Sequence, residues 1–215
     1  MTARGSNQPR LDRRAAIRVL LAERGDLLVV TGLGSTTYDA ASLGDDERNF
    51  YLWGAMGGAA MVGLGRAIAR PDRPVLVVTG DGDTLMGLGA LATIGVQSPP
   101  NLAIAVFDNG RYAETRMQPS HTDGAVQLTG VARACGIAAV FDIADEAALA
   151  DFARLVQRKE RTLFARVAIT ADEPPRAAAA RWGAVEEPLP QGQRSGLALI
   201  GGGFDVRRRE VPADI

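Results

Sequence analysis

The chain has 215 residues, with 24 Lys or Arg against 25 Asp or Glu, so its formal net charge is −1. A near-neutral chain that is 47% hydrophobic and 23% charged has ordinary globular composition, which excludes the broad basic surface of nucleic-acid or membrane-surface binders. A single cysteine, Cys135, excludes an internal disulfide, a cysteine-based zinc site and a cluster held by several thiolates.

Two features place the chain among soluble, cytoplasmic proteins. Residues 1–9 are polar and lack an apolar stretch, which predicts a disordered N-terminal tail and no signal peptide. Residues 49–65 form an uncharged stretch of 17 residues, but five glycines interrupt it and it is shorter than the ~20 apolar residues of a membrane-spanning helix. We therefore expect neither a membrane nor a nucleic acid among its partners.

Helices and strands are predicted to alternate from residue 11 onward. Apolar residues at positions 11, 15, 19 and 22 have helical spacing, and Gly25 is placed to end that helix. Continuous apolar runs are typical of strands buried on both faces of a parallel sheet, and they occupy residues 27–31, 75–79, 102–107, 138–141 and 162–169. Helices are predicted over residues 57–69, 84–97, 127–135 and 146–159.

This alternation predicts an α/β fold: an open parallel sheet with helices on both faces, spanning residues 10–171. From residue 172 the chain becomes rich in proline and glycine, which predicts an extended C-terminal tail over residues 172–215. Cys135, before Gly136 at a predicted helix end, is expected to be a small buried apolar residue.

The first glycine-rich turn, TGLGSTT at residues 31–37, follows the first predicted strand. Gly32-x-Gly34 is part of a dinucleotide-binding fingerprint, but Thr37 occupies the position of its third glycine. A tight turn at the carboxyl end of a strand is the favoured interpretation. Such a turn can still contact a phosphate, and a dinucleotide site stays an alternative.

The second turn carries more chemistry. Gly80-Asp81-Gly82 follows strand 75–79, and a helix is predicted to open directly after it. Strand 102–107 ends in Asp108-Asn109, which places Asn109 28 residues after Asp81. Because the carboxyl ends of parallel strands meet at one edge of a sheet, Asp81 and Asn109 should lie together. Carboxylate, amide and carbonyl oxygens suit Mg²⁺ with diphosphate. The alternative is that Asp81 caps a helix and Asn109 forms a turn.

Glycine-aspartate-glycine followed at this distance by asparagine resembles the signature of thiamine diphosphate enzymes, in their diphosphate-binding domain. Three further segments resemble decarboxylase members of that family. They are GAMGG at residues 54–58, LGALATIG at residues 88–95 and DNGRYAETRMQPSHT at residues 108–122. The last two are similar to the sulfopyruvate decarboxylase beta subunit and to the C-terminal half of phosphonopyruvate decarboxylase. The resemblance covers about residues 11–169.

The resemblance implies roles for individual residues. Asp81 and Asn109 would bind Mg²⁺ through their side chains and Arg111 through its backbone carbonyl. Met56 would lie between the two rings of the cofactor, although a core methionine is the alternative. His121 would handle a proton or pair with an anionic substrate group, the alternative being a surface histidine. The implied cofactor contacts are Gly34, Ser35, Thr36, Met56, Gly80, Asp81, Gly82, Asp83, Thr84, Asn109, Arg111 and Tyr112.

The chain departs from the family pattern in two places. Asp108 stands where many members have asparagine, and we expect this exchange to be harmless because the next residue carries the metal. Arg116-Met117 stands where relatives have small residues, which leaves open whether Arg116 contacts a substrate or fills an interface.

The implied activity is decarboxylation of a small anionic 2-oxo acid, of the sulfopyruvate or phosphonopyruvate type, to the aldehyde. Thiamine diphosphate and Mg²⁺ are the implied cofactors. In this family a glutamate from a second, pyrimidine-binding domain activates the cofactor, so we expect a partner subunit that carries it and a hetero-oligomer. Alternatives are a carboligase subunit similar to acetolactate synthase and a non-catalytic subunit that binds the cofactor or a dinucleotide. A 2-oxo-acid ferredoxin oxidoreductase subunit is excluded by the missing cluster cysteines.

Overall fold

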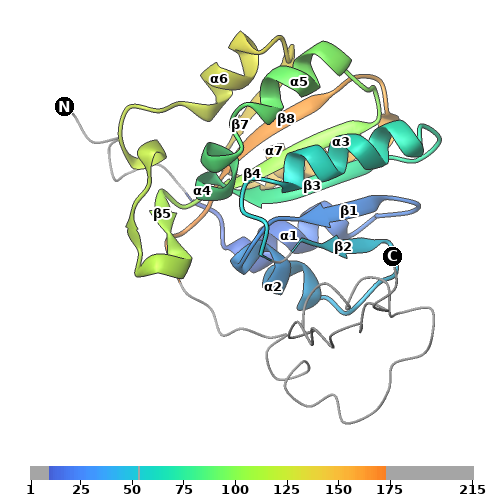
Figure 1. Cartoon of the computed structure of the whole chain (residues 1–215). Helices are drawn as coiled ribbons and strands as arrows, with labels where there is room; N and C mark the ends of the chain where they lie inside the picture. The colour runs from blue at the N-terminus through green and yellow to red at the C-terminus, as the bar shows by residue number, and fades with distance from the viewer. Residues whose placement is uncertain (1–9, 53, 173–215) are drawn as a thin grey trace, which may run out of the picture.

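The computed structural model describes residues 10–52 and 54–172 of the chain. Both predicted tails therefore fall outside the described residues, apart from residue 172. Within the described part, strands and helices alternate and form a sheet covered on both faces (Figure 1).

Six strands form one parallel sheet in the order β2-β1-β3-β4-β8-β7. Their bounds are β1 Leu28–Thr31, β2 Asn49–Tyr51, β3 Val75–Gly80, β4 Leu102–Asp108, β7 Ala139–Ile143 and β8 Leu163–Ala168. The predicted open parallel sheet is confirmed. The chain moves outward from β1 to β2 and then returns to β3 on the other side of β1. Ligands bind at such a reversal in open α/β sheets, beyond the carboxyl ends of the strands.

Helices cover the two faces of this sheet (Figure 1). One face carries α1 Arg13–Leu21 and α7 Glu146–Arg158, and the other carries α3 Ala59–Ala69, α5 Ala90–Gln97 and α6 Leu128–Ala134. Two short helices follow strand ends, α2 Ser35–Ala41 after β1 and α4 Asp81–Met86 after β3. A small lobe consists of β5 Arg111–Tyr112, η1 Ala113–Thr115, β6 Gln118–Pro119 and η2 His121–Asp123.

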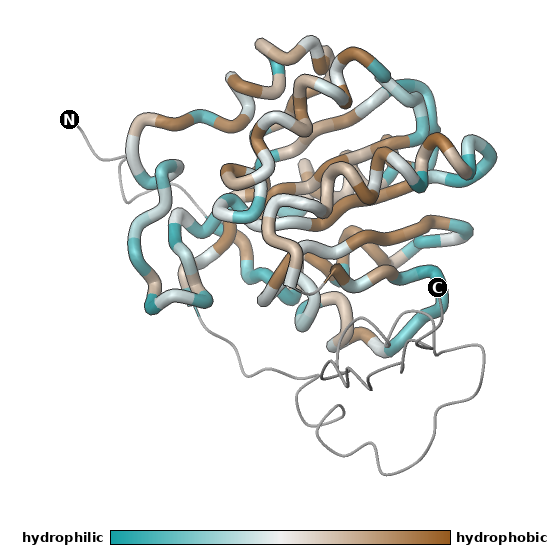
Figure 2. The backbone as a smooth tube through the Cα atoms, viewed as in Figure 1, coloured by the Kyte–Doolittle hydropathy of each residue, from teal (hydrophilic) through white to brown (hydrophobic). Residues whose placement is uncertain are grey.

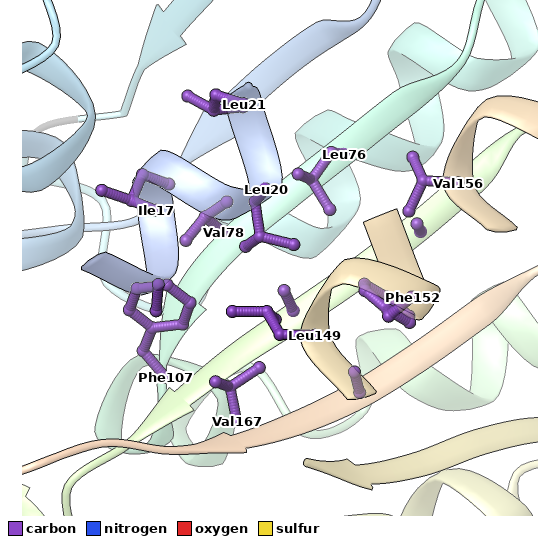
Figure 3. Close-up of a cluster of buried hydrophobic side chains, with 14 of the residues drawn as sticks. Ile17, Leu20, Leu21, Leu76, Val78, Phe107, Leu149, Phe152, Val156 and Val167 are labelled. Carbon is purple, nitrogen blue, oxygen red and sulfur yellow. The ribbon is translucent and has the colours of Figure 1, made fainter. Parts of the chain in front are cut away.

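Apolar side chains form a separate cluster on each face of the sheet. Figure 3 shows the first cluster, in which Leu20 of α1 lies beside Val78 of β3 and α7 contributes Leu149 and Phe152. Strand β4 is buried along its whole length and β3 along all but its last residue, and both strands are largely hydrophobic in the tube of Figure 2. None of the helices among the described residues has the length and apolar character needed to cross a bilayer.

Several predicted elements differ from the structure. The helix predicted over residues 84–97 is two helices, α4 and α5, separated by a segment that contains Gly87 and Gly89. Residues 31–37 do not form only a turn, because α2 begins at Ser35. Edge strand β2 and the β5–β6 hairpin had no predicted counterpart. Cys135 is only half-buried, so the prediction of a buried cysteine is wrong.

Candidate functional site

A cavity of about 180 Å³ lies beyond the carboxyl ends of β1, β3 and β4. It therefore occupies the reversal point of the sheet, where a ligand is expected. Ten of the predicted site residues line it: Ser35, Thr36, Met56, Gly80, Asp81, Gly82, Asp83, Asn109, Arg111 and Tyr112. Gly34, Thr84 and His121 are not part of its wall.

Asp81 is the first residue of α4 and is only 2% exposed. Its Oδ2 accepts hydrogen bonds from the hydroxyl groups of Ser120 and Thr122, the latter over 3.0 Å. The helix was predicted to open after residue 82, but it begins at Asp81 with Gly80 as its N-cap. Asp81 is therefore not the helix cap, and its carboxylate faces the lobe and the cavity instead.

Asp108 and Asn109 lie beside Asp81, because Gly80 of β3 pairs with Phe107 of β4 in the sheet. Oδ1 of Asn109 accepts a hydrogen bond from the backbone N–H of Arg111 over 2.8 Å. Asn109 therefore does form a turn, as the alternative interpretation proposed, and the same turn brings the backbone of Arg111 to the cavity wall. The turn and a ligand role are compatible, since an amide oxygen has two lone pairs.

Asp108 is buried and fully engaged within the protein. Its Oδ1 accepts from the Gly110 N–H over 3.0 Å and from the Thr122 hydroxyl over 2.7 Å. Its Oδ2 forms an ion pair with Nε of Arg166, whose Nη1 lies 2.7 Å from Oδ1 of Asp142. The aspartate at position 108, where many family members have asparagine, is thus paired with a positive charge, Arg166 of β8. That it is harmless stays a prediction.

Four carboxylates near the cavity are buried, and only two of them have an ion pair among the described residues. Asp39 pairs with Arg13 and Asp108 with Arg166, whereas Asp81 and Asp83 have hydrogen bonds alone. Burial, together with the nearby charge of Asp108, raises the pKa of Asp81 to about 6. Asp81 is therefore a buried carboxylate at a cavity wall that a cation would stabilise.

No group of three or more His, Cys, Asp or Glu within residues 10–52 and 54–172 could hold a metal ion. A cation at Asp81 would have to take its other protein ligands from amide and carbonyl oxygens. Asn109 and the backbone of Arg111 are the groups of this kind that line the same cavity. This donor set suits a hard cation such as Mg²⁺, which takes oxygen ligands and keeps positions for phosphate and water.

The carboxylate of Asp83 joins the loop that contains Gly57 to β3 and does not face outward as a ligand. Oδ1 accepts from the backbone N–H of Gly57 and Oδ2 from the hydroxyl of Thr79. A Cβ at Gly32 would overlap Oδ2 of Asp83. Close packing against Asp83 thus explains why residue 32 is glycine. Gly32 is therefore no longer evidence for a dinucleotide fingerprint.

Gly82 lies between two predicted site residues. A Cβ there would come within 2.6 Å of the Tyr112 ring and 3.6 Å of the Met56 methyl group. Met56 is therefore at the cavity wall and not in either apolar cluster, so the core-methionine alternative is wrong. His121 is exposed, and its Nδ1 lies 3.0 Å from the Tyr112 hydroxyl.

Two of the hydroxyl groups that were predicted to bind phosphate, those of Thr36 and Thr84, donate hydrogen bonds to backbone carbonyls instead. Thr36 donates to the carbonyl of Gly32 over 3.2 Å, and Thr84 donates to the carbonyl of Gly80 over 2.8 Å. Gly34 has φ +78°, and a Cβ on it would meet the Glu114 carboxylate at 2.7 Å. The hairpin lobe therefore packs directly onto the turn after β1.

Four residues of the site were not predicted: Arg13, Ser120, Thr122 and Arg166. Ser120 and Thr122 stand in the quoted segment DNGRYAETRMQPSHT, which was the available signal. Arg13 and Arg166 come from α1 and β8, far from every motif, and no local pattern marks them.

Comparisons with known proteins agree with this geometry. Residues 32–165 match the family described as thiamine pyrophosphate enzyme, C-terminal TPP binding domain. The chain is 47% identical over 137 residues to the phosphonopyruvate decarboxylase of Streptomyces viridochromogenes, covering 63% of this chain and 34% of that protein. It is 40% identical over 126 residues to sulfopyruvate decarboxylase subunit beta of Methanothermobacter thermautotrophicus, covering 59% and 67%.

The fold also matches a solved structure. An X-ray structure of a protein from Mycobacterium smegmatis, described as a thiamin diphosphate-dependent enzyme, superposes with a TM-score of 0.65 at 16% identity. The match covers 77% of this chain and 33% of that one. This chain thus spans about a third of the length of the Streptomyces protein and of the mycobacterial one.

Proposed function

The chain belongs to the thiamine pyrophosphate enzymes, by their C-terminal TPP binding domain, and we propose that it forms the diphosphate-binding part of a decarboxylase. The proposed substrate is a small anionic 2-oxo acid of the sulfopyruvate or phosphonopyruvate type, converted to the aldehyde and CO₂. The names of the relatives in Streptomyces and Methanothermobacter support this substrate class.

One observation carries the proposal: Asp81 is buried at the cavity wall, with no ion pair among the described residues, next to Asn109 on the neighbouring strand. Both hydroxyl groups bonded to Asp81 use Oδ2. Oδ1 accepts no hydrogen bond from another described residue, which leaves it for a ligand on the cavity side. A divalent cation bound to a diphosphate supplies the missing positive charge.

The residues present fit both groups. Asp81, Asn109 and the Arg111 carbonyl offer three oxygen ligands for Mg²⁺, which typically takes the rest of its octahedron from phosphate and water. Because Gly82 has no Cβ, the Tyr112 ring and the Met56 methyl group can lie close to its backbone. These residues thus make up a cradle for the diphosphate and for the ring system that follows it.

When bound, thiamine diphosphate supplies an electron sink for the carbanion that loss of CO₂ leaves. Met56 would contact the cofactor from the cavity wall. The Tyr112 hydroxyl, 3.0 Å from Nδ1, holds the His121 ring next to a residue of the cavity wall. His121 there handles a proton or pairs with the anionic group of the substrate.

We further propose that the activating glutamate comes from a second subunit that closes the cavity. The relative from Methanothermobacter is named as a beta subunit, which supports a two-subunit enzyme. Thr115 at the cavity wall is exposed, which supports this side of the cavity as the one that a second subunit covers.

The test replaces Asp81 with alanine in the chain co-purified with its partner subunit. Calorimetry with thiamine diphosphate, with and without Mg²⁺, measures binding, and CO₂ release from sulfopyruvate, phosphonopyruvate and pyruvate measures activity. We expect Asp81→Ala to weaken Mg²⁺-dependent binding by about 100-fold or more, as loss of a metal ligand exceeds the 10–100-fold of outer-shell losses.

Asp151→Ala is the matched control, because Asp151 is an exposed aspartate of α7 that is not part of the cavity wall. It should bind and turn over like the wild type. Binding of thiamine diphosphate that is unchanged in Asp81→Ala, or binding of a nicotinamide dinucleotide in its place, would contradict the proposal. Turnover of pyruvate in preference to both anionic substrates would contradict the substrate class alone.

A further inference from the structure

Arg13 is a buried cation that none of the predicted site motifs includes. It is the first residue of α1, its side chain is 3% exposed, and it lines the cavity together with Asn109 and Thr36. The helix brings it there because α1 packs on α2 at the carboxyl ends of the strands. The cavity thus has a positive charge in its buried part.

A single contact holds the Arg13 side chain. Its Nε donates to Oδ2 of Asp39 over 2.7 Å, and Asp39 is itself 1% exposed. The two terminal amino groups of Arg13 form no hydrogen bond with a residue in ranges 10–52 and 54–172. Arg166 is different, since it uses both Nε and Nη1 within the protein. Guanidinium has five N–H donors, so the two terminal amino groups of Arg13 keep four donors that can bind an anion.

The geometry suits an anion at the free side of the guanidinium. Asp39 holds Nε, which fixes the plane of the group and leaves its outer edge for a ligand. Two parallel N–H donors on that edge match two oxygens of a phosphate. The neighbouring Phe107 and Ile169 are buried and apolar, so this part of the cavity offers little competing water.

We propose that Arg13 binds the terminal phosphate of the cofactor diphosphate, with Asp39 as the residue that positions it. The proposal rests on the proposed function. Arg13 shares the buried side of the cavity with Asn109, a proposed Mg²⁺ ligand, whereas Glu114 and Thr115 lie on the exposed side. A diphosphate bound to Mg²⁺ therefore lies within the part that Arg13 lines, and the substrate enters on the other side.

The experiment measures anion affinity directly, without turnover. Inorganic pyrophosphate with Mg²⁺, thiamine diphosphate and thiamine are titrated by calorimetry into the full chain and into its complex with the partner subunit. Arg13→Met should weaken pyrophosphate and thiamine diphosphate by about 10- to 100-fold, the range for a charged hydrogen-bonded contact. Thiamine, which has no phosphate, should bind as it does to the wild type.

Two further variants separate binding from folding. Arg13→Met/Asp39→Asn leaves no unpaired carboxylate, so it should fold like the wild type and still lose pyrophosphate affinity. Arg14→Met is the matched control, because Arg14 lies 3.9 Å from the other oxygen of Asp39 but is not part of the cavity wall. It should bind pyrophosphate normally.

Unchanged pyrophosphate affinity in both Arg13 variants, or an equal loss for thiamine, would overturn the proposal. So would a rise in KM for an anionic substrate with pyrophosphate affinity unchanged, since the anion at Arg13 would then be the substrate. Failure of the proposed function looks different: the wild-type complex would bind no thiamine diphosphate at all. Binding of pyrophosphate that depends on Arg13 could still be observed in that case. If the wild type does not bind pyrophosphate, both the proposed function and the proposed role of Arg13 are contradicted.

Discussion

The hydroxyl oxygen of Thr122 lies 3.0 Å from Oδ2 of Asp81 and 2.7 Å from Oδ1 of Asp108. One hydroxyl proton cannot serve two ionised carboxylates at once. Arg166 compensates Asp108, but no described residue compensates Asp81 in this way. The pair is therefore balanced when either a proton or a cation reaches Asp81.

Thr122→Val removes this shared donor while keeping the shape of the side chain. We expect a loss of about 1–3 kcal/mol in the free energy of unfolding, because a buried acceptor is left unsatisfied. Denaturant unfolding without added metal measures it. Thr115→Val, at an exposed position of the hairpin, should stay within about 0.5 kcal/mol of the wild type. Equal losses in the two variants would refute the role of the Thr122 hydroxyl.

Arg166→Met should be more damaging, because it leaves Asp108 buried without a counter-charge. Breaking a buried pair costs about 3–5 kcal/mol, whereas removing both charges costs much less. Asp108→Asn in the Arg166→Met background should therefore recover most of the loss. Asp142→Asn is the control, since that side chain is 55% exposed and its pair with Arg166 should contribute at most about 1 kcal/mol. Additive effects of the two buried substitutions would contradict the pairing.

The strands of the site and the polar residues at their ends could be predicted from the sequence, because each depends on a local pattern. Apolar runs mark the buried strands, and a polar residue directly after such a run must lie at a strand end. Asp81 and Asn109 could be placed together on this ground alone. The helix α2 escaped prediction because serine, threonine and glycine at residues 34–37 have weak helix propensity, and packing on β1 overrides it.

The residues that tune the site could not be predicted in the same way. Arg166 lies 58 positions after Asp108, and Arg13 lies 26 positions before Asp39. Each pair forms only when different elements pack together, and an arginine in a strand or helix gives no local sign of its partner. Sequence spacing reports one element at a time, whereas burial of these charges is a property of the assembled layers.

Two glycines in helices offer a matched pair of substitutions. A Cβ at Gly95 of α5 would overlap the carbonyl oxygen of Cys135, so the two helices α5 and α6 meet closely there. Gly95→Ala should destabilise by about 1–3 kcal/mol through overpacking. Gly65 of α3 has nothing within 4 Å of its Cβ position, so Gly65→Ala should stabilise by about 0.5–1 kcal/mol through helix propensity. Thermal unfolding of both variants measures this, and stabilisation in both would contradict the close contact.

The pH dependence of stability can be tested at Asp46, away from the cavity. A hydrogen bond from Arg48 at 2.5 Å lowers the pKa of Asp46 below its ordinary value, with Arg24 at 3.4 Å adding to the effect. A carboxyl whose folded pKa is lowered stabilises the fold above the unfolded pKa of about 3.9 and loses this contribution as the pH falls. Asp46→Asn should therefore cost about 0.2–1 kcal/mol at pH 7 and a smaller amount near pH 2. A difference that grows on acidification would contradict it.

The last prediction concerns the loop that carries Met56. Asp83 accepts hydrogen bonds from the Gly57 N–H and the Thr79 hydroxyl, so this carboxylate joins the loop to β3. An asparagine has one acceptor oxygen, so Asp83→Asn must lose one of the two hydrogen bonds. Its NH₂ group, a donor, then faces the donor that has lost its acceptor. We expect amide exchange in residues 54–58 to accelerate about 10- to 100-fold, measured by hydrogen–deuterium exchange mass spectrometry. Asp151→Asn should leave this peptide unchanged, and equal protection in both variants would show that the loop is held by other contacts.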